Sequence, residues 1–227
     1  MPARLRLALF VAGLLALAAV AGVLLFAIGE KSVPAPPSFA GATRPPDIPP
    51  TDFGVRDAHG RMLRLADLRG RPVVVTFLYT TCEETCPLTA QQIRLALDAL
   101  GHDVPVVAVS VDPENDTPRR ARRFALEQSM QGRMRWALGD AQQLQRIWRA
   151  YGIQPQTTDS EHSASTVLLD GRGVQRVGFA AGVLTPEALA HDIALLEREQ
   201  RRRAASGSWP AAISSPQAAG AARRPRA

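Results

Sequence analysis

The residues best suited to chemistry are the only two cysteines, Cys82 and Cys86, which are followed directly by Pro87. At this spacing their sulfurs can converge on one metal ion or form a disulfide. Thiolates are soft ligands that suit Cu(I), and they are also the nucleophiles of thiol–disulfide exchange. A purely structural disulfide is the third interpretation, but closing so short a loop gains little chain-entropy stabilisation. The pattern therefore favours a redox or metal site.

A buried strand and a following helix are predicted to position the cysteines. Residues 73–79 form a short apolar run rich in β-branched residues, and residues 88–100 place leucine and isoleucine at helical spacing before Gly101. Pro87 suits a first helical turn because its missing N–H needs no partner there. Both cysteines should thus lie at the carboxyl end of a parallel strand, where α/β sheets place their sites and where a helix dipole favours thiolate.

The remaining periodic segments alternate between strand and helix. Strands are predicted at residues 104–111, 134–138, 166–169 and 176–179, and helices at 117–128, 140–151 and 185–199. A hairpin is predicted around Asp57-Ala-His-Gly60, at the start of the domain. This order implies an α/β fold whose mixed sheet is flanked by helices on both faces.

The N-terminus is predicted to be a membrane anchor. Arg4 and Arg6 precede an uncharged run from Leu7 to Ile28, which at about 1.5 Å per residue would span about 33 Å as a helix. The arginines place the N-terminus in the cytoplasm and the rest of the chain outside. A cleaved signal peptide is the alternative, although its apolar core is normally shorter. A single-pass protein of a bacterial inner membrane with a periplasmic domain is the better fit.

Composition divides the chain into four parts, predicted as an anchor (1–31), a Pro-rich linker (32–51), one domain (52–199) and a disordered tail (200–227). With 46% hydrophobic residues among 227, a packed core is expected and wholesale disorder is excluded. The formal net charge of +6 equals the number of arginines in residues 201–227, which contain no acid. The basic balance therefore belongs to the tail and does not indicate a nucleic-acid binder.

The sequence resembles the SCO1/SenC family, the copper chaperones of cytochrome c oxidase assembly, over most of residues 52–199. The resemblance is carried by several motifs together: Asp52-Phe53, Phe77-Leu-Tyr79, the C-x3-C-P motif of residues 82–87, Val109-Ser-Val-Asp-Pro113, Asp116-Thr-Pro118, His162-Ser163 and Thr166-Val-Leu-Leu-Asp170-Gly171. It implies a thioredoxin-like fold. One departure is that Glu83-Glu84 lies between the cysteines, which adds negative charge near a bound metal.

The resemblance further implies that Cys82, Cys86 and His162 bind copper, as Cu(I) or Cu(II), and that the cysteines are redox-active. The implied function is a metallochaperone, not an enzyme in the strict sense, that delivers copper to the binuclear site of cytochrome c oxidase. The expected partners are the oxidase copper subunit and the membrane, with thioredoxin-like reductants or other copper chaperones as further candidates. The site leaves Asp159 and Glu161 as candidate groups to orient the histidine.

The alternative function is a periplasmic thiol–disulfide oxidoreductase acting on cysteines of the oxidase copper subunit or of other clients. The C-x3-C spacing differs from the C-x2-C of thioredoxin-type enzymes. The segment before the strand at 166–169 also contains a histidine and no proline. Both features favour metal binding over disulfide exchange as the main role.

Two charged clusters have ordinary structural interpretations. Asp112, Glu114 and Asp116 precede Thr117-Pro118, and a strand-to-helix turn with an N-cap explains them better than a hard-metal site. The following helix carries four arginines, at positions 119, 120, 122 and 123. A solvated face is the default interpretation of these arginines, and contact with anionic lipid or an acidic acceptor is the sharper one.

Overall fold

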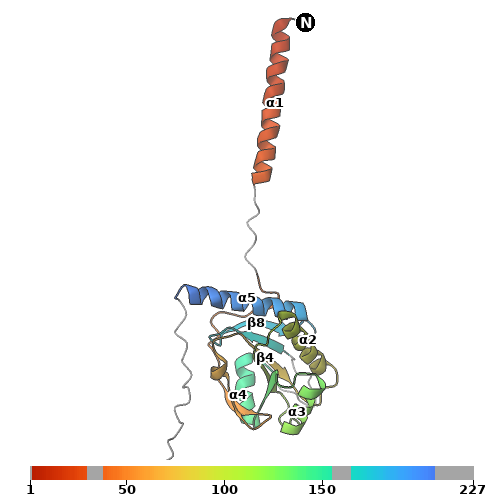
Figure 1. Ribbon diagram of the computed structural model, residues 1–227, viewed down its shortest axis with the longest axis vertical. Coiled ribbons are helices and arrows are strands. Elements are labelled where there is room, and N and C mark those ends of the chain that lie inside the picture. Colours follow the sequence, from red (N-terminus) through yellow and green to blue (C-terminus); the bar gives the residue numbers. More distant parts are fainter. Residues whose placement is uncertain (1, 30–37, 155–164, 208–227) are drawn as a thin grey trace, which may run out of the picture. The chain divides into compact units, whose positions relative to one another are not determined.

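The structure, a computed structural model, describes residues 2–29, 38–154 and 165–207. The chain divides into two units, Met1–Ser38 and Phe39–Ala227. The first contains helix α1 (Ala3–Gly29), which is 27 residues long (Figure 1). Within the described residues, none of the helices combines the length and the apolar character that crossing a membrane demands. The anchor predicted from the sequence therefore stays a prediction.

In the described part of the second unit, eight strands form one mixed sheet. Their order is β1-β8-β7-β4-β5-β6-β2-β3. The strands are β1 (Ala42–Thr43), β2 (Gly54–Asp57), β3 (Met62–Arg64), β4 (Val73–Leu78), β5 (Val106–Ser110), β6 (Met134–Leu138), β7 (Ser165–Leu169) and β8 (Gln175–Ala180). Strands β4, β5 and β6 are parallel, whereas β7 runs antiparallel to β4, and β2–β3 is the predicted N-terminal hairpin. The mixed α/β sheet predicted from the sequence is confirmed.

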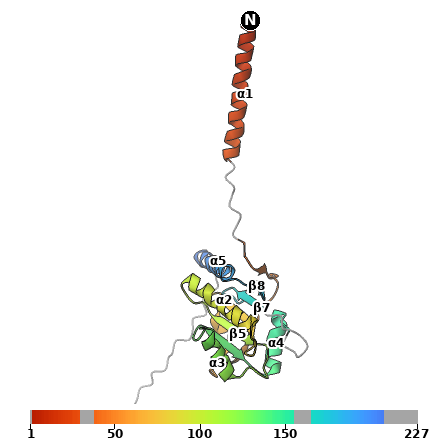
Figure 2. The same cartoon turned by 90° about the vertical axis from the view of Figure 1, so that its right-hand side faces the viewer.

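Helices cover both faces of this sheet, as Figures 1 and 2 show. They are the short 3-10 helix η1 (Leu65–Leu68) and the α-helices α2 (Thr85–Leu100), α3 (Pro118–Glu127), α4 (Ala141–Tyr151) and α5 (Pro186–Ala205). Buried residues of α2, α3 and α5 form one core cluster with one face of the sheet, and those of η1 and α4 form a second cluster with the other. Cys86 belongs to the first cluster.

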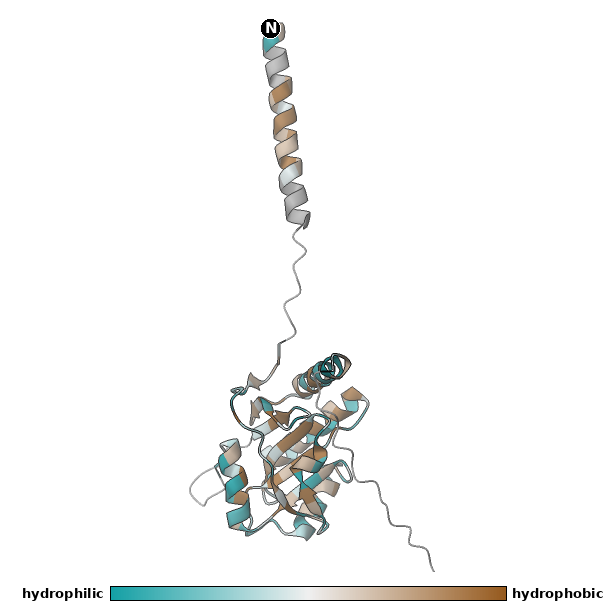
Figure 3. Cartoon of the chain, turned by 90° about the vertical axis from the view of Figure 1, so that its left-hand side faces the viewer, coloured by the Kyte–Doolittle hydropathy of each residue, from teal (hydrophilic) through white to brown (hydrophobic). Residues whose placement is uncertain are grey.

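The central strands are apolar throughout because both of their faces are covered. Every residue of β4 and β5 is buried. Figure 3 shows the hydrophobic strands in the middle and hydrophilic residues on the outward surfaces of the helices. Two buried threonines, Thr76 and Thr166, satisfy each other with a 3.0 Å hydrogen bond between their hydroxyl oxygens, where β4 pairs with β7.

The predicted helix boundaries rest on caps that the structure contains. Thr117 accepts a hydrogen bond from the backbone N–H of Arg120 and starts α3, and Thr185 starts α5 in the same way. Asp140 and Gln143 form a capping box at α4. Gly101 ends α2 in a left-handed conformation at φ 73°, which glycine adopts without a steric penalty.

Strand β1 lies inside the Pro-rich range 32–51, where the sequence predicts only an extended linker. It pairs antiparallel with β8, so this part of the range is a strand of the sheet. Gly41, just before β1, approaches β8 so closely that a Cβ at this position would lie 2.5 Å from Val177 Cγ1. The carboxylate of Asp192 on α5 accepts the backbone N–H groups of Ala40 and Gly41, at 2.8 and 2.9 Å. This contact depends on a residue 151 positions away, which local patterns do not reveal.

Two helices are longer than the sequence predicts. Helix α2 begins at Thr85, three residues earlier than expected, so Cys86 lies inside its first turn. Helix α5 continues to Ala205, into the range predicted as a disordered tail. Its last turn contains Arg202 and Arg203, whose charges interact favourably with the helix C-terminus.

Candidate functional site

The two cysteines lie where β4 ends and α2 begins. Cys82 is partly exposed in the connecting loop, whereas Cys86 is completely buried in the first turn of the helix. The backbone N–H of Cys86 donates a hydrogen bond of 3.2 Å to Sγ of Cys82. Both thiols are free. The structure therefore confirms that the C-x3-C spacing brings the two cysteines together at the carboxyl end of a parallel strand.

The sulfur of Cys82 performs the task of a helix cap. Glu84 occupies the N-cap position of α2, but its side chain accepts no capping hydrogen bond. The first N–H groups of a helix have no partner within the helix, and here one of them is bonded by Cys82 Sγ. A sulfur so placed receives the positive end of the helix dipole, which favours its anionic form.

The two thiols consequently differ in acidity. A hydrogen bond from the Cys86 side chain lowers the pKa of Cys82 to about 5, against the opposing effect of burial. The same hydrogen bond, together with burial, raises the pKa of Cys86 well above its usual value. A partly exposed thiolate is thus supported by a buried thiol that keeps its proton. Such a pair offers one ready nucleophile or soft ligand, and the second sulfur becomes available when its proton leaves.

A buried carboxylate holds the loop from the neighbouring strand. Asp116, which is 6% exposed, accepts a 2.7 Å hydrogen bond from the backbone N–H of Thr80 and a 2.5 Å bond from the hydroxyl of Ser110. Ser110 is the last residue of β5, and the pairing of Phe77 with Val109 places the ends of β4 and β5 side by side. Burial raises the pKa of Asp116, although both hydrogen bonds oppose the shift.

The role of Asp116 was missed by the sequence interpretation, which assigned residues 112–116 to a capped turn. The turn is confirmed, because Thr117 caps α3. The additional contact from Asp116 to Thr80 joins residues 36 positions apart. One signal was available: an acidic residue directly before an N-cap threonine, at the carboxyl end of a strand parallel to the one that leads to the cysteines.

The rim around the cysteines is charged and partly apolar. Glu83 and Glu84 are exposed in the loop, and Glu114 is exposed in the adjacent turn. No ion pair within the described residues neutralises any of these three carboxylates. Leu88, one turn into α2, is 52% exposed. The site therefore opens to the surface and is accessible to another protein.

The third predicted ligand, His162, lies outside the described residues, as do its candidate partners Asp159 and Glu161. The geometry of the Cys82, Cys86 and His162 set stays a prediction for that reason. Within residues 2–29, 38–154 and 165–207, no group of three or more His, Cys, Asp or Glu side chains is arranged to hold a metal ion. The two sulfurs are the part of the set that the structure brings together.

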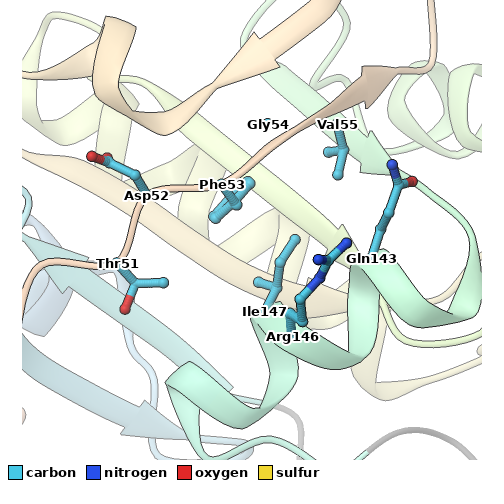
Figure 4. A pocket seen from close by; sticks show the side chains of 8 residues that line it. All are labelled: Thr51, Asp52, Phe53, Gly54, Val55, Gln143, Arg146 and Ile147. Atoms are coloured by element: carbon cyan, nitrogen blue, oxygen red, sulfur yellow. The ribbon is translucent and has the colours of Figure 1, made fainter.

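Two hollows in the surface have linings that do not include a cysteine. One, of about 300 Å³, lies between the start of β2 and α4, with Phe53, Val55 and Ile147 as its apolar lining and Arg146 beside them (Figure 4). The other, of about 410 Å³, lies beside β1 and is lined in part by Arg44. The thiol pair is therefore a surface site, distinct from both hollows.

Comparison with known proteins gives a consistent result. The family model SCO1/SenC matches residues 42–197. A SCO1 protein homolog of Bacillus subtilis (strain 168) is 37% identical over 76 residues, covering 32% of this chain and 39% of that protein. Protein SenC of Rhodobacter capsulatus is 30% identical over 137 residues, covering 56% and 61% respectively. The matches thus span from one third to about three fifths of the length of the curated relatives.

Solved structures of Sco proteins share the fold. Bradyrhizobium japonicum ScoI with copper bound is 27% identical with a TM-score of 0.55, covering 64% of this chain and 98% of that one. Arabidopsis thaliana ScoI with copper bound is 21% identical with a TM-score of 0.59, covering 66% and 98%. The second likeness shows the fold alone. The thioredoxin-like architecture, with helices flanking the mixed sheet, is thereby confirmed.

Proposed function

Because this chain belongs to the SCO1/SenC family, we propose that it binds copper in the assembly of cytochrome c oxidase and passes the ion to the binuclear copper site of the oxidase. The observation that carries the proposal is the thiol pair: Cys86 N–H bonds to Cys82 Sγ at the open carboxyl end of β4. Two soft sulfurs at an exposed edge suit Cu(I). An open site suits a protein that must release its metal to an acceptor.

His162 completes the proposed ligand set. Strand β7 begins at Ser165, and the pairing of Thr166 with Thr76 places that beginning beside the carboxyl end of β4. The chain between residues 162 and 165 can span at most about 11 Å. This reach supports imidazole as the third ligand, and imidazole accepts either copper oxidation state.

Copper titration of the full chain, kept in mild detergent after reduction, tests the proposal. We expect one Cu(I) per wild-type molecule. Cys82→Ser and Cys86→Ser should each abolish tight binding, because one sulfur cannot hold the ion alone. His162→Ala should weaken binding and alter the Cu(II) spectrum, whereas His59→Ala, at an exposed turn, should change neither. Undiminished copper binding by the cysteine variants would reject the proposal.

A second function is favoured by the unequal acidity of the thiols. Cys82 thiolate can attack a client disulfide and form a mixed disulfide, releasing one client thiolate. Cys86, once deprotonated, then attacks Cys82 Sγ, which closes the Cys82–Cys86 disulfide and releases the second client thiol. The client is reduced and this protein is oxidised, so an external dithiol must restore it. Client reduction that is retained in His162→Ala would separate this function from copper binding.

We also propose that α1 tethers the protein to a bacterial inner membrane, with residues 39–207 in the periplasm. The support is the uncharged run from Leu7 to Ile28 behind Arg4 and Arg6. Alkaline carbonate extraction of cell membranes tests it, since a spanning segment stays in the pellet. Release of the intact chain into the supernatant would contradict the tether.

A further inference from the structure

The outward side of α3 carries a dense set of arginines beside the cysteine loop. The helix is fixed to the core by Ala121 and Phe124, which are 1% and 4% exposed, and Phe124 packs edge-on against Trp136 with ring centroids 5.0 Å apart. The arginines flank these two positions, and all four are exposed: 119, 120, 122 and 123.

Most of this positive charge is not neutralised within the domain. Arg123 pairs with Glu127 at 2.7 Å. In the described parts of the chain, the other three have no carboxylate within ion-pair distance. Arg120 instead donates to the backbone carbonyl of Asn115, at 2.9 Å, and Arg122 donates to the carbonyl of Ala58. A guanidinium group has five N–H donors, so each retains donors for a partner.

The first turn of α3 and the cysteine loop form one edge of the molecule. Asp116 bonds to the N–H of Thr80, two residues before Cys82, and lies three residues before Arg119. Figure 2 shows α2 and α3 on the same side of the sheet, with α4 on the opposite side. A protein that takes an ion directly from Cys82 must approach this edge, and its surface will then face Arg119 and Arg120.

We propose that Arg119 and Arg120, with Arg122 behind them, are the docking surface for an acidic patch on the protein that accepts the copper. This inference rests on the proposed function and names the chemistry of its partner. Guanidinium groups bind carboxylates through paired, planar hydrogen bonds, which gives orientation as well as attraction. Unneutralised arginines also attract an acidic surface over a distance of about 10 Å at moderate ionic strength.

The carboxylates of the loop add a constraint on orientation. Glu83 and Glu84 lie between the two cysteines, so acidic groups directly over the sulfurs would be repelled. The acidic patch of the partner must therefore lie to the α3 side of its metal site. Anionic lipid fits less well, because a membrane pressed against α3 would cover the same edge from which copper must leave.

Charge reversal tests the surface. We would measure the affinity of the copper-loaded full chain, in uncharged detergent, for the isolated copper-site domain of the oxidase subunit from the same cell. Arg119→Glu/Arg120→Glu should weaken binding at least about tenfold at low salt, and the neutral Arg119→Gln/Arg120→Gln should give an intermediate loss. The matched control Arg146→Glu/Arg198→Glu changes the same charge at exposed positions of α4 and α5, and should stay within about twofold of wild type.

The remaining outcomes separate the explanations. The difference between wild type and the α3 reversal should shrink at about 1 M salt, where the screening length falls to about 3 Å. An equal loss in the control, or none in the α3 reversal, would overturn the inference. So would arginine-dependent binding to phosphatidylglycerol vesicles without any effect on the oxidase domain. Wild type that binds copper but not the domain would also overturn it, whereas wild type that binds the domain without copper would contradict the proposed function alone.

Discussion

Two loops of the domain are each held by a buried aspartate, but the charges around the two carboxylates differ. Asp57, at the β2–β3 hairpin, accepts the backbone N–H groups of His59 and Arg61 and pairs with Arg135 at 2.9 Å. Asp116, at the cysteine loop, accepts one N–H and one hydroxyl. No cation of the described residues lies within ion-pair distance of Asp116.

The difference sets the pKa of each group in an opposite direction. Burial would raise the pKa of Asp57, but the hydrogen bond from Arg135 and those from the backbone lower it overall. Burial raises the pKa of Asp116, and its hydrogen bonds do not compensate. A guanidinium beside Asp116 would restore the balance, but it would also repel a copper ion at Cys82. The hairpin is thus arranged for stability, whereas the cysteine loop gives up some stability to keep cations other than the metal away.

The largest expected effect is on the hairpin. Asp57→Ala should lower the free energy of unfolding by about 3 kcal/mol, because Arg135 and two backbone N–H groups lose a buried acceptor. Urea unfolding of the full chain in detergent, followed by tryptophan fluorescence, measures it. The control is Asp98→Ala, which removes an exposed partner of Arg133 and should cost less than about 1 kcal/mol. Equal losses in the two variants would refute the distinction between the hairpin and the surface.

The contrast between the two aspartates separates what the sequence predicts from what it does not. Hydrophobic periodicity and caps predict the central strands and α2 to α5, because these signals are local: Thr117, Asp140 and Gly101 act within a few residues of themselves. The C-x3-C motif predicts the thiol pair for the same reason. Asp116 to Thr80 and Asp192 to Gly41 span 36 and 151 positions, and neither could be inferred from a pattern along the chain. Which acidic residues become buried anchors is decided by tertiary packing.

The same substitution at the two sites should have effects of opposite sign. Asn keeps the shape of Asp but removes its charge. Asp57→Asn should destabilise the protein at pH 7 by about 2 kcal/mol, since a charged pair becomes a neutral contact. Asp116→Asn should be neutral or stabilising by about 0.5 kcal/mol, because the amide needs no counter-ion and its oxygen still accepts from Thr80. Destabilisation by both variants would show that the charge of Asp116 is compensated in some other way.

The pH profile sharpens the comparison further. Asp57 has a lowered folded-state pKa, so its contribution is present above the unfolded value of 3.8 and is lost as pH falls through the folded value. Asp116 has a raised pKa, so its contribution is present below 3.8 and is lost as pH rises through the folded value. The stability difference between wild type and Asp57→Asn should therefore grow from pH 3 to 6, and that for Asp116→Asn should move in the opposite direction. Parallel profiles would contradict the two assignments.

The smallest effect is expected at an exposed ion pair that belongs to neither loop. His102 Nε2 lies 2.8 Å from Glu197 Oε1 and links the end of α2 to α5. The hydrogen bond to Glu197 raises the pKa of His102 above 6.5, so its contribution is complete below that value and is lost as pH rises through the folded value. Because the imidazole is half exposed, His102→Gln should cost only about 0.3 kcal/mol at pH 5.5 and nothing at pH 9. Thermal unfolding at the two values measures this, with His59→Gln as the control that should show no such dependence. A loss at pH 5.5 as large as that of Asp57→Asn at pH 7 would mean that exposure does not weaken this pair, and that burial is not what gives the two aspartates their strength.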